Sequence, residues 1–172
     1  ACAFDDAAKD YDTVSLLQQT VADRLVESFD LIKINPVSIL DIGSGTGYGS
    51  RTLKQRFKKA QYYQSDISGE MLKTSRKKSP RYFSKNHFLC ADAARMPIED
   101  KQFDLVFSSL MLQWCNDLEL VFAEVKRMLK PGGVFLFASF GPDTLKELRE
   151  CWQKVDDDIH VNAFVDILAF IL

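Results

Sequence analysis

Short apolar runs, bounded by polar or turn-forming residues, recur along the chain. In the first, Val37 to Ile42, mostly β-branched and apolar side chains stand between Pro36 and Gly43. Runs of this length and composition are typical of buried β-strands. The later runs of this kind are Gln61 to Asp66, Asn86 to Ala91, Phe103 to Ser109 and Val134 to Ser139. The pattern therefore predicts a series of short strands.

Between these runs, apolar residues recur at steps of three and four, the period of an amphipathic helix. One such stripe, in residues 12–32, consists of Val14, Leu17, Val21, Leu25, Phe29 and Ile32. Asn116 followed by Glu119 resembles a capping box, so a helix is expected to begin there and to end at Pro131-Gly132-Gly133. Further helices are predicted over Tyr48 to Phe57, Gly69 to Lys78 and Thr144 to Val155, the last with Leu145, Leu148, Trp152 and Val155 on one side.

Strands that alternate with helices predict an α/β fold, Rossmann-like, with a mostly parallel sheet flanked by helices. The 172 residues, 47% of them hydrophobic, suffice for one core, so residues 1–172 are expected to form a single domain. Residues 1–32 would be a leading helical segment that covers the functional site, at one edge of the sheet.

The charge and cysteine content narrow the possible functions. A net charge of −2 argues against a general nucleic-acid binder. The four cysteines include no C-x-x-C pair, which favours buried thiols in a reducing cytoplasm over disulfides or a zinc site. No apolar run approaches the roughly 20 residues of a membrane span, and no signal peptide is evident, so we expect a soluble cytoplasmic protein without a membrane partner.

The first strand runs into a glycine-rich turn, Asp41-x-Gly43-x-Gly45-x-Gly47. Alternate glycines permit a sharp turn and let a ligand approach main-chain N–H groups at the start of a helix. The dinucleotide fingerprint G-x-G-x-x-G is absent, because Tyr48 and Ser50 stand where its third glycine would be. An NAD site is therefore disfavoured.

This turn resembles the first motif of the class I S-adenosylmethionine-dependent methyltransferases. Asp66, Asp92 and Pro131-Gly132-Gly133 follow at the family's spacing. The resemblance implies S-adenosylmethionine as cofactor and no metal. It also implies roles for the residues of the motif: the loop amides of Gly43, Ser44, Gly45 and Gly47 for the cofactor carboxylate, Asp41 for its amino group, Asp66 for the ribose, Ile67 and Met71 beside the adenine, Asp92 and Ala93 at the adenine amino group, and Ser108 to Leu110 at the sulfonium end.

Other stretches resemble a narrower family, the malonyl-acyl-carrier-protein O-methyltransferases of biotin synthesis. They are Ala3-Phe4 with Ala7-Ala8 and Tyr11, Leu110 to Asp117, Phe140 to Leu148, and His160 with Asn162 and Phe164. This resemblance implies methyl transfer to the free carboxylate of a malonyl thioester. Malonyl-acyl carrier protein or malonyl-CoA would then be the partner; the oligomeric state stays open.

A malonyl carboxylate, with a reference pKa near 4, is ionised at neutral pH, so its attack on a sulfonium methyl group needs no general base. Catalysis would then depend mainly on positioning. Tyr11 and Gln113 are the candidates for orienting the carboxylate, with Trp114 as a wall; His160 is expected to be structural.

Three alternatives remain open at this stage. The same stretches are similar to a methyltransferase-fold complex I assembly factor of mitochondria, to which a protein arginine hydroxylase activity is ascribed. The acceptor could instead be a quinone precursor or another small molecule, or the pocket could belong to a non-catalytic binding module. The intact glycine turn and acids argue against the last.

Two further features concern the surface. In the methyltransferase family a sixth and a seventh strand complete the sheet edge, whereas only Phe164 to Leu172 remains here. Three explanations are open: the chain is truncated, a disordered portion has been left out, or a partner covers the edge. One of them is needed because an uncovered apolar edge favours aggregation. A basic run, Lys73, Arg76, Lys77, Lys78, Arg81 and Lys85, could meet an acidic carrier protein.

Overall fold

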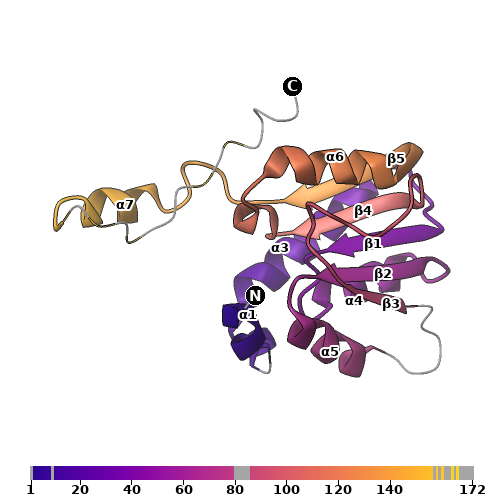
Figure 1. The fold of residues 1–172 in the computed structure, drawn as a ribbon, viewed down its shortest axis with the longest axis horizontal. Coiled ribbons are helices and arrows are strands. Elements are labelled where there is room, and N and C mark those ends of the chain that lie inside the picture. The colour runs from indigo at the N-terminus through magenta and orange to yellow at the C-terminus, as the bar shows by residue number, and fades with distance from the viewer. Residues whose placement is uncertain are drawn as a thin grey trace.

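The structure, a computed structural model, describes residues 2–8, 10–79, 86–156, 158, 160, 164 and 166. Its centre is a five-stranded sheet with the order β3-β2-β1-β4-β5, and every neighbouring pair is parallel (Figure 1). The strands are β1 (Ser38–Ile42), β2 (Gln61–Asp66), β3 (Asn86–Cys90), β4 (Phe103–Ser109) and β5 (Leu129–Ala138). The predicted Rossmann-like α/β fold is confirmed.

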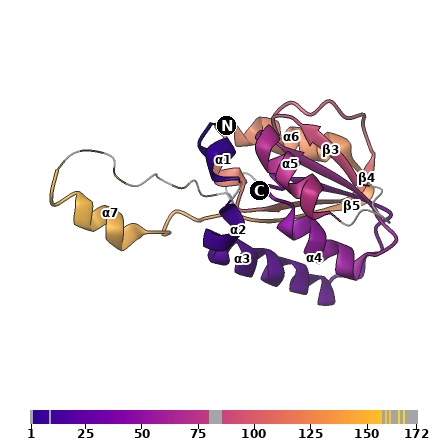
Figure 2. The ribbon, with the colours of Figure 1, turned by 90° about the horizontal axis from the view of Figure 1, so that it is seen from below.

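Helices cover both faces of this sheet. They are α1 (Cys2–Ala7), α2 (Tyr11–Val14), α3 (Leu16–Glu27), α4 (Tyr48–Arg56), α5 (Gly69–Lys78), α6 (Leu118–Met128) and α7 (Lys146–Trp152), with short 3₁₀ helices η1 (Ser28–Asp30) and η2 (Leu112–Trp114). Figure 2 shows α6 on one side of the sheet and α3 with α4 on the other.

The two faces of the sheet have separate hydrophobic cores. On one face, Leu40 and Val106 of the central strands pack with Val121, Val125 and Met128 of α6. On the other, Ile39 and Phe107 pack with Val26 and Phe29, which follow one another on α3 and η1, and with Leu53 of α4. Side chains alternate between the two faces along each strand, so one pair of central strands supplies both cores. The carboxyl ends of the strands are thereby held rigidly at one edge.

The predicted long helix over residues 12–32 is wrong in its continuity. It is broken at Ser15, whose φ of −98° and ψ of 35° lie outside the helical region. Ser15 is buried and its hydroxyl accepts a hydrogen bond from Gln19. The break turns α2 away from α3, so Val14 and Leu17 of the predicted stripe are exposed, and Ala22 and Val26 are the buried residues of α3.

The ends of α6 also differ from the prediction. Asp117, not Asn116, is the N-cap, since its carboxylate accepts from the N–H of Leu120 at 3.0 Å. At the other end Pro131-Gly132-Gly133 lies inside β5, where the pairing with β4 is irregular and Gly132 has a φ of 78°. A glycine-rich irregularity lets strand pairing begin at Leu129, directly after the helix.

Helix α7 stands apart from the sheet in both views (Figures 1 and 2). Its predicted apolar side, Leu145, Leu148, Trp152 and Val155, is exposed. Its N-cap is Leu145, with a φ of 59°, so the helix begins at Lys146 and not at Thr144 as predicted.

Other predictions concern the end of the chain and the thiols. Apart from Phe164 and Asp166, the stretch Phe164 to Leu172 lies outside the described residues, as do Asn162, Arg81 and Lys85. Cys90 and Cys151 are exposed, so the expectation of buried thiols is wrong for them. Within the part of the chain that the structure describes, no helix is long and apolar enough to cross a membrane.

Candidate functional site

A cavity of about 360 Å³ lies at the carboxyl ends of the strands. Residues following β1, β2, β3 and β4 contribute to its wall, and Phe4, Tyr11 and Asp12 of the leading segment close it from the outside. The strand order reverses direction between β1 and β4, and ligands of open α/β sheets bind at such a point.

The glycine turn after β1 depends on backbone conformations that glycine favours. Gly43, Gly45 and Gly47 have φ values of 69°, 53° and 79°. A Cβ on Gly43 would lie 2.2 Å from Cγ of Met111, and one on Gly47 would lie 2.0 Å from the hydroxyl of Ser75. At Gly45 a Cβ would meet nothing within 4 Å, because this residue faces the cavity.

The amides of this turn are already hydrogen-bonded within the protein. The N–H groups of Gly43 and Ser44 donate to the carbonyl of Ser65 at 2.8 and 3.0 Å, and that of Gly47 donates to Ser44. The N–H of Gly45 donates to the Asp66 carboxylate at 2.8 Å. Of the four amides predicted to meet a ligand carboxylate, only that of Gly45 is bonded to a side chain. A movement of the Asp66 side chain would free it for a ligand.

Asp41 is buried at the end of β1 and lines the cavity. Its carboxylate accepts from the Ser50 hydroxyl at 2.6 Å. Burial raises the pKa of Asp41 to about 7, and the neighbouring Asp66 acts in the same direction, while the bond from Ser50 opposes it.

Asp66 is half-buried at the end of β2. Its two oxygens accept from the N–H groups of Gly45 and Ser68, both at 2.8 Å. Burial raises its pKa, these main-chain donors oppose the rise, and Asp5 adds to it. A carboxylate held by main-chain donors keeps a fixed orientation toward the cavity.

The remaining predicted cofactor residues also line the cavity. Met71 is buried on α5, Ile67 is exposed, and Ala93 is buried after β3. Asp92 is exposed, and its carboxylate accepts from the N–H of Ala94 at 2.9 Å.

At the end of β4, the structure differs from the prediction for Ser108. Ser108 is fully buried, and its hydroxyl donates to the carbonyl of Ile42 at 3.0 Å, so it does not line the cavity. Ser109 and Leu110 line it instead. The hydroxyls of Ser109 and of Ser44, which also lines the cavity, are buried without a hydrogen-bond partner among the described residues.

The two predicted positioning residues are placed differently. Tyr11 lines the cavity, and burial, followed by the charges of Asp66 and Asp12, raises the pKa of its phenol. Gln113 points elsewhere: its amide donates to the carbonyl of Leu110 at 2.7 Å and accepts from Ser139 at 3.3 Å. Trp114 lines the cavity, as expected of a wall, and Phe4 packs edge-on against it at 5.3 Å.

Asp12 ties the leading segment to three later parts of the chain. Its carboxylate accepts from the hydroxyl of Thr46, pairs with Lys78 at 2.6 Å and lies 3.4 Å from Arg51. Burial alone would raise the pKa of Asp12, but the bonds from Lys78 and Thr46 lower it below its usual value. Asp12 and Thr46 line the cavity without having been predicted as site residues. The polarity of Asp12 at the start of an apolar stripe was the only signal for it in the sequence.

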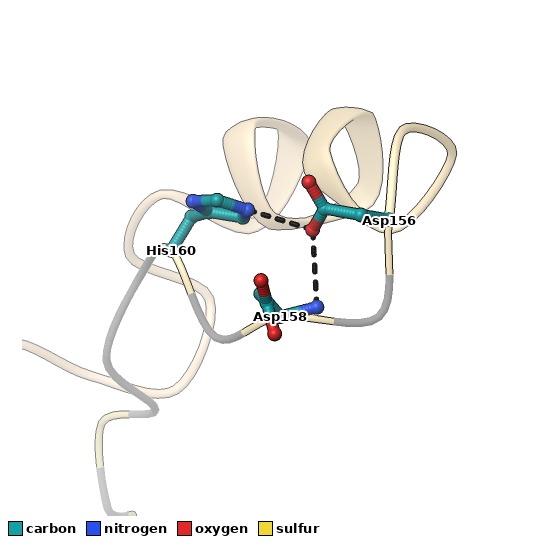
Figure 3. A group of neighbouring side chains, drawn as sticks. All are labelled: Asp156, Asp158 and His160. Carbon is teal, nitrogen blue, oxygen red and sulfur yellow. Dashed lines mark hydrogen bonds and ion pairs between the residues drawn. The ribbon is translucent and has the colours of Figure 1, made fainter.

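A second group of polar side chains lies outside this cavity. Figure 3 shows Asp156, Asp158 and His160 close together in the segment after α7. His160 pairs with Asp156 at 2.7 Å and stacks on Trp152 with ring centroids 4.1 Å apart. All three are exposed, and both the N–H of Asp158 and the imidazole of His160 bond to Asp156. The cavity is therefore the better candidate for chemistry.

Comparisons with known proteins agree with this geometry. A family model described as a methyltransferase domain matches residues 40–137. The malonyl-[acyl-carrier protein] O-methyltransferase of Halorhodospira halophila is 42% identical over 164 residues, covering 95% of this chain and 55% of its own length. The chain thus spans about half the length of the curated relatives that it matches.

Solved structures show the same fold. A chain from the complex between the Haloferax volcanii Trm112 methyltransferase activator and a methyltransferase superposes with a TM-score of 0.77 at 23% identity, over 97% of this chain and 72% of its own. The phosphoethanolamine N-methyltransferase 2 of Haemonchus contortus, solved with S-adenosyl-L-methionine, gives a TM-score of 0.61 at 27% identity, over 76% and 32% of the two chains. The chain belongs to the methyltransferase-domain family.

Proposed function

We propose that the protein transfers a methyl group from S-adenosylmethionine to the free carboxylate of a malonyl thioester, an early step of biotin synthesis in the cytoplasm. The observation that carries this proposal is the similarity of 95% of the chain, at 42% identity, to a malonyl-[acyl-carrier protein] O-methyltransferase. The partner would be malonyl-acyl carrier protein or malonyl-CoA.

The residues at the cavity fit this cofactor. Asp66, fixed by two main-chain donors, presents lone pairs suited to ribose hydroxyls. Asp41 offers a carboxylate for an ammonium group, and Met71 with Ala93 offers an apolar wall for a base. The hydroxyl of Ser44, which has no hydrogen-bond partner among the described residues, supplies a further polar contact.

When bound, S-adenosylmethionine supplies an electrophilic methyl group on a cationic sulfur. An oxygen of the malonyl carboxylate would form the new bond to carbon while the carbon–sulfur bond breaks, and its electron pair would stay on sulfur. No proton moves, so the cavity residues have only to orient the acceptor and exclude water. Holding the reactants in near-attack geometry can contribute roughly 7–11 kcal/mol. Tyr11 lines the cavity and suits this role, whereas Gln113 would need to leave its bond to Leu110.

The domain organisation follows from the same proposal. Residues 1–172 would act as one methyltransferase domain in which residues 1–32 cover the site. The cavity contacts of Phe4, Tyr11 and Asp12 support this arrangement. The cover would open to exchange cofactor and product.

The deciding experiment is methyl transfer from labelled S-adenosylmethionine. We expect label on malonyl-carrier protein in a base-labile ester, and none on the unloaded carrier protein. Label on a quinone precursor instead would overturn the acceptor, and the absence of S-adenosylhomocysteine binding would overturn the cofactor assignment. A hydroxylated arginine with no methyl transfer would favour the alternative function.

A further inference from the structure

The cavity lacks a feature expected of a site for an anionic acceptor. Among the described residues that line it there is no lysine or arginine, whereas five aspartates do so: Asp12, Asp41, Asp66, Asp92 and Asp117. Each of these accepts a hydrogen bond from the protein itself. An ionised carboxylate cannot donate, so in their ionised form none of them would bind another carboxylate.

Besides the phenol of Tyr11, two serine hydroxyls of the cavity wall can donate hydrogen bonds. The hydroxyls of Ser44 and Ser109 are buried and have no partner among the described residues. Buried polar atoms are nearly always paired, so an unpaired hydroxyl beside a ligand cavity favours a contact with the ligand. Each oxygen is itself closed off from solvent, so this contact needs a turn of the serine side chain toward the cavity. The two belong to neighbouring strands, Ser44 to the turn after β1 and Ser109 to the end of β4.

The strand order assigns the two hydroxyls to different ligands. Asp66, Met71 and Ala93, which suit a nucleoside, come from the β2 and β3 side of β1. Ser109 lies on the opposite side of β1, on the wall that continues through Met111 to Trp114. Trp114 is 57% exposed and therefore stands at the mouth, where an acceptor on a carrier would enter.

We infer that the Ser109 hydroxyl binds and orients the carboxylate of the methyl acceptor, an inference that rests on the proposed function. A neutral donor suits the reaction better than a cation. The carboxylate loses its charge as the ester forms, so a guanidinium would stabilise the reactant more than the transition state and slow the step. A hydroxyl fixes the oxygen with a weaker ground-state interaction.

The test measures equilibrium binding by calorimetry, with S-adenosylhomocysteine first and malonyl-carrier protein second. For Ser109→Ala we expect S-adenosylhomocysteine affinity within about twofold of wild type and a loss of about tenfold or more for malonyl-carrier protein, as for other hydrogen bonds to charged groups. Ser109→Thr, which keeps the hydroxyl, should restore most of this loss. Ser28→Ala removes a hydroxyl that bonds to the carbonyl of Leu25 away from the cavity and should change neither affinity.

Several results would contradict the assignment. Unchanged malonyl affinity in Ser109→Ala would overturn it, and so would a tenfold loss of S-adenosylhomocysteine affinity, which we expect of Ser44→Ala. Binding of S-adenosylhomocysteine also reports that each variant is folded. Failure of the proposed function would be visible in the unaltered protein, as S-adenosylhomocysteine binding without malonyl binding, and would remove the role of Ser109 with it.

Discussion

Asp41 changes its protonation near neutral pH in the protein without cofactor, and this change affects the free energy of unfolding. Its pKa of about 7 stands well above the ordinary value, because the carboxylate is buried. Between about pH 4 and 7 the folded protein therefore binds more protons here than the unfolded chain does. It follows that this group lowers the free energy of unfolding as the pH rises through that window.

Asp41→Asn should remove this dependence while leaving an acceptor for Ser50. We expect wild type to lose about 2–4 kcal/mol of unfolding free energy relative to Asp41→Asn between about pH 4 and 8. Urea unfolding at a series of pH values measures the difference, and a pH-independent difference would contradict the assignment. The same ionisation should affect cofactor affinity near pH 7, whereas turnover at saturating cofactor should show no titrating base.

Gly43 and Gly45 provide a matched pair of substitutions, since both have positive φ. In Gly43→Ala the new Cβ would also collide with Met111, whereas in Gly45→Ala it would point into the cavity. We expect a loss of about 1–2 kcal/mol from the backbone in both, with a further loss of about 1–3 kcal/mol from overpacking in Gly43→Ala.

Thermal unfolding and calorimetry together separate the two effects. Gly45→Ala should weaken S-adenosylhomocysteine binding by more than its small loss of stability suggests. Equal stabilities for the two variants would show that Met111 moves aside without strain.

The spacing of the motifs predicted which aspartates lie at the site. It did not predict which of the adjacent serines, Ser108 or Ser109, faces the cavity. Asp41 and Asp66 each lie at the end of a strand, at a position that the motif defines, so their place at the site was predictable. Whether Ser108 or Ser109 lines the cavity depends on how β4 alternates beside β1, since Ser108 is committed to Ile42. The side-chain direction of Gln113 depends likewise on the short helix η2, which no pattern in the sequence indicated.

At the scale of elements, Asp12 joins α2 to the rest of the molecule. Its partners Thr46, Arg51 and Lys78 belong to the glycine turn, α4 and α5. A second attachment is the bond from the Ser68 hydroxyl to Asp5 of α1, at 2.5 Å. The leading helices are thus held to the sheet by few and mostly polar contacts.

Asp12→Asn should loosen this cover without unfolding the sheet. We expect faster hydrogen exchange in residues 4–15 and a several-fold faster release of S-adenosylhomocysteine, with a change in unfolding free energy below about 1 kcal/mol. Asp30→Asn is the control, since it removes an exposed ion pair between Asp30 of η1 and Arg56 of α4. Unchanged exchange in Asp12→Asn would show that apolar contacts such as Phe4 with Trp114 suffice.

The strands were predictable as elements, while the helix ends were less so. Buried parallel strands consist of short apolar runs, and β4 has the predicted bounds, Phe103–Ser109. The break at Ser15 was hidden, because the apolar period continues through it and the burial of Ser15 has no signal in the sequence. Pro131-Gly132-Gly133 was taken for a helix stop, yet the sheet absorbs it as an irregularity.

At the scale of the whole molecule, charge is unevenly distributed. The net charge is −2, yet Arg76 and Lys77 lie exposed together in the last turn of α5. An acidic carrier protein would be steered toward such a face, and the rate of encounter would fall with added salt.

Arg76→Glu with Lys77→Glu should therefore lower kcat/KM for malonyl-carrier protein severalfold at low salt, and less at high salt. The same charge change at the exposed Lys58 and Lys59, on the turn before β2, is the control. A small malonyl thioester should be methylated equally well by both variants. If both pairs of substitutions had the same effect on the carrier protein, α5 would not be its docking site.

The placement of α7 could not be derived from the sequence. An amphipathic pattern predicts that a helix buries its apolar side, but not which surface receives it. Here Leu148 and Trp152 stay exposed on a helix apart from the sheet. The same limit applies to the sheet edge, since β5 is the outermost of the described strands on its side.

The attachments of Asp5 and Asp12 have a consequence for the order of events during synthesis. Asp12 is 34 residues from Thr46 and 66 from Lys78, and Asp5 is 63 from Ser68. Helices α1 and α2 leave the ribosome before β1, so they must wait for β1, β2 and α5 before they can dock, because such distant contacts close late. The helices that cover the cavity are thus synthesised before β1 but dock only after α5 has formed. In a nascent chain the cavity stays open until then.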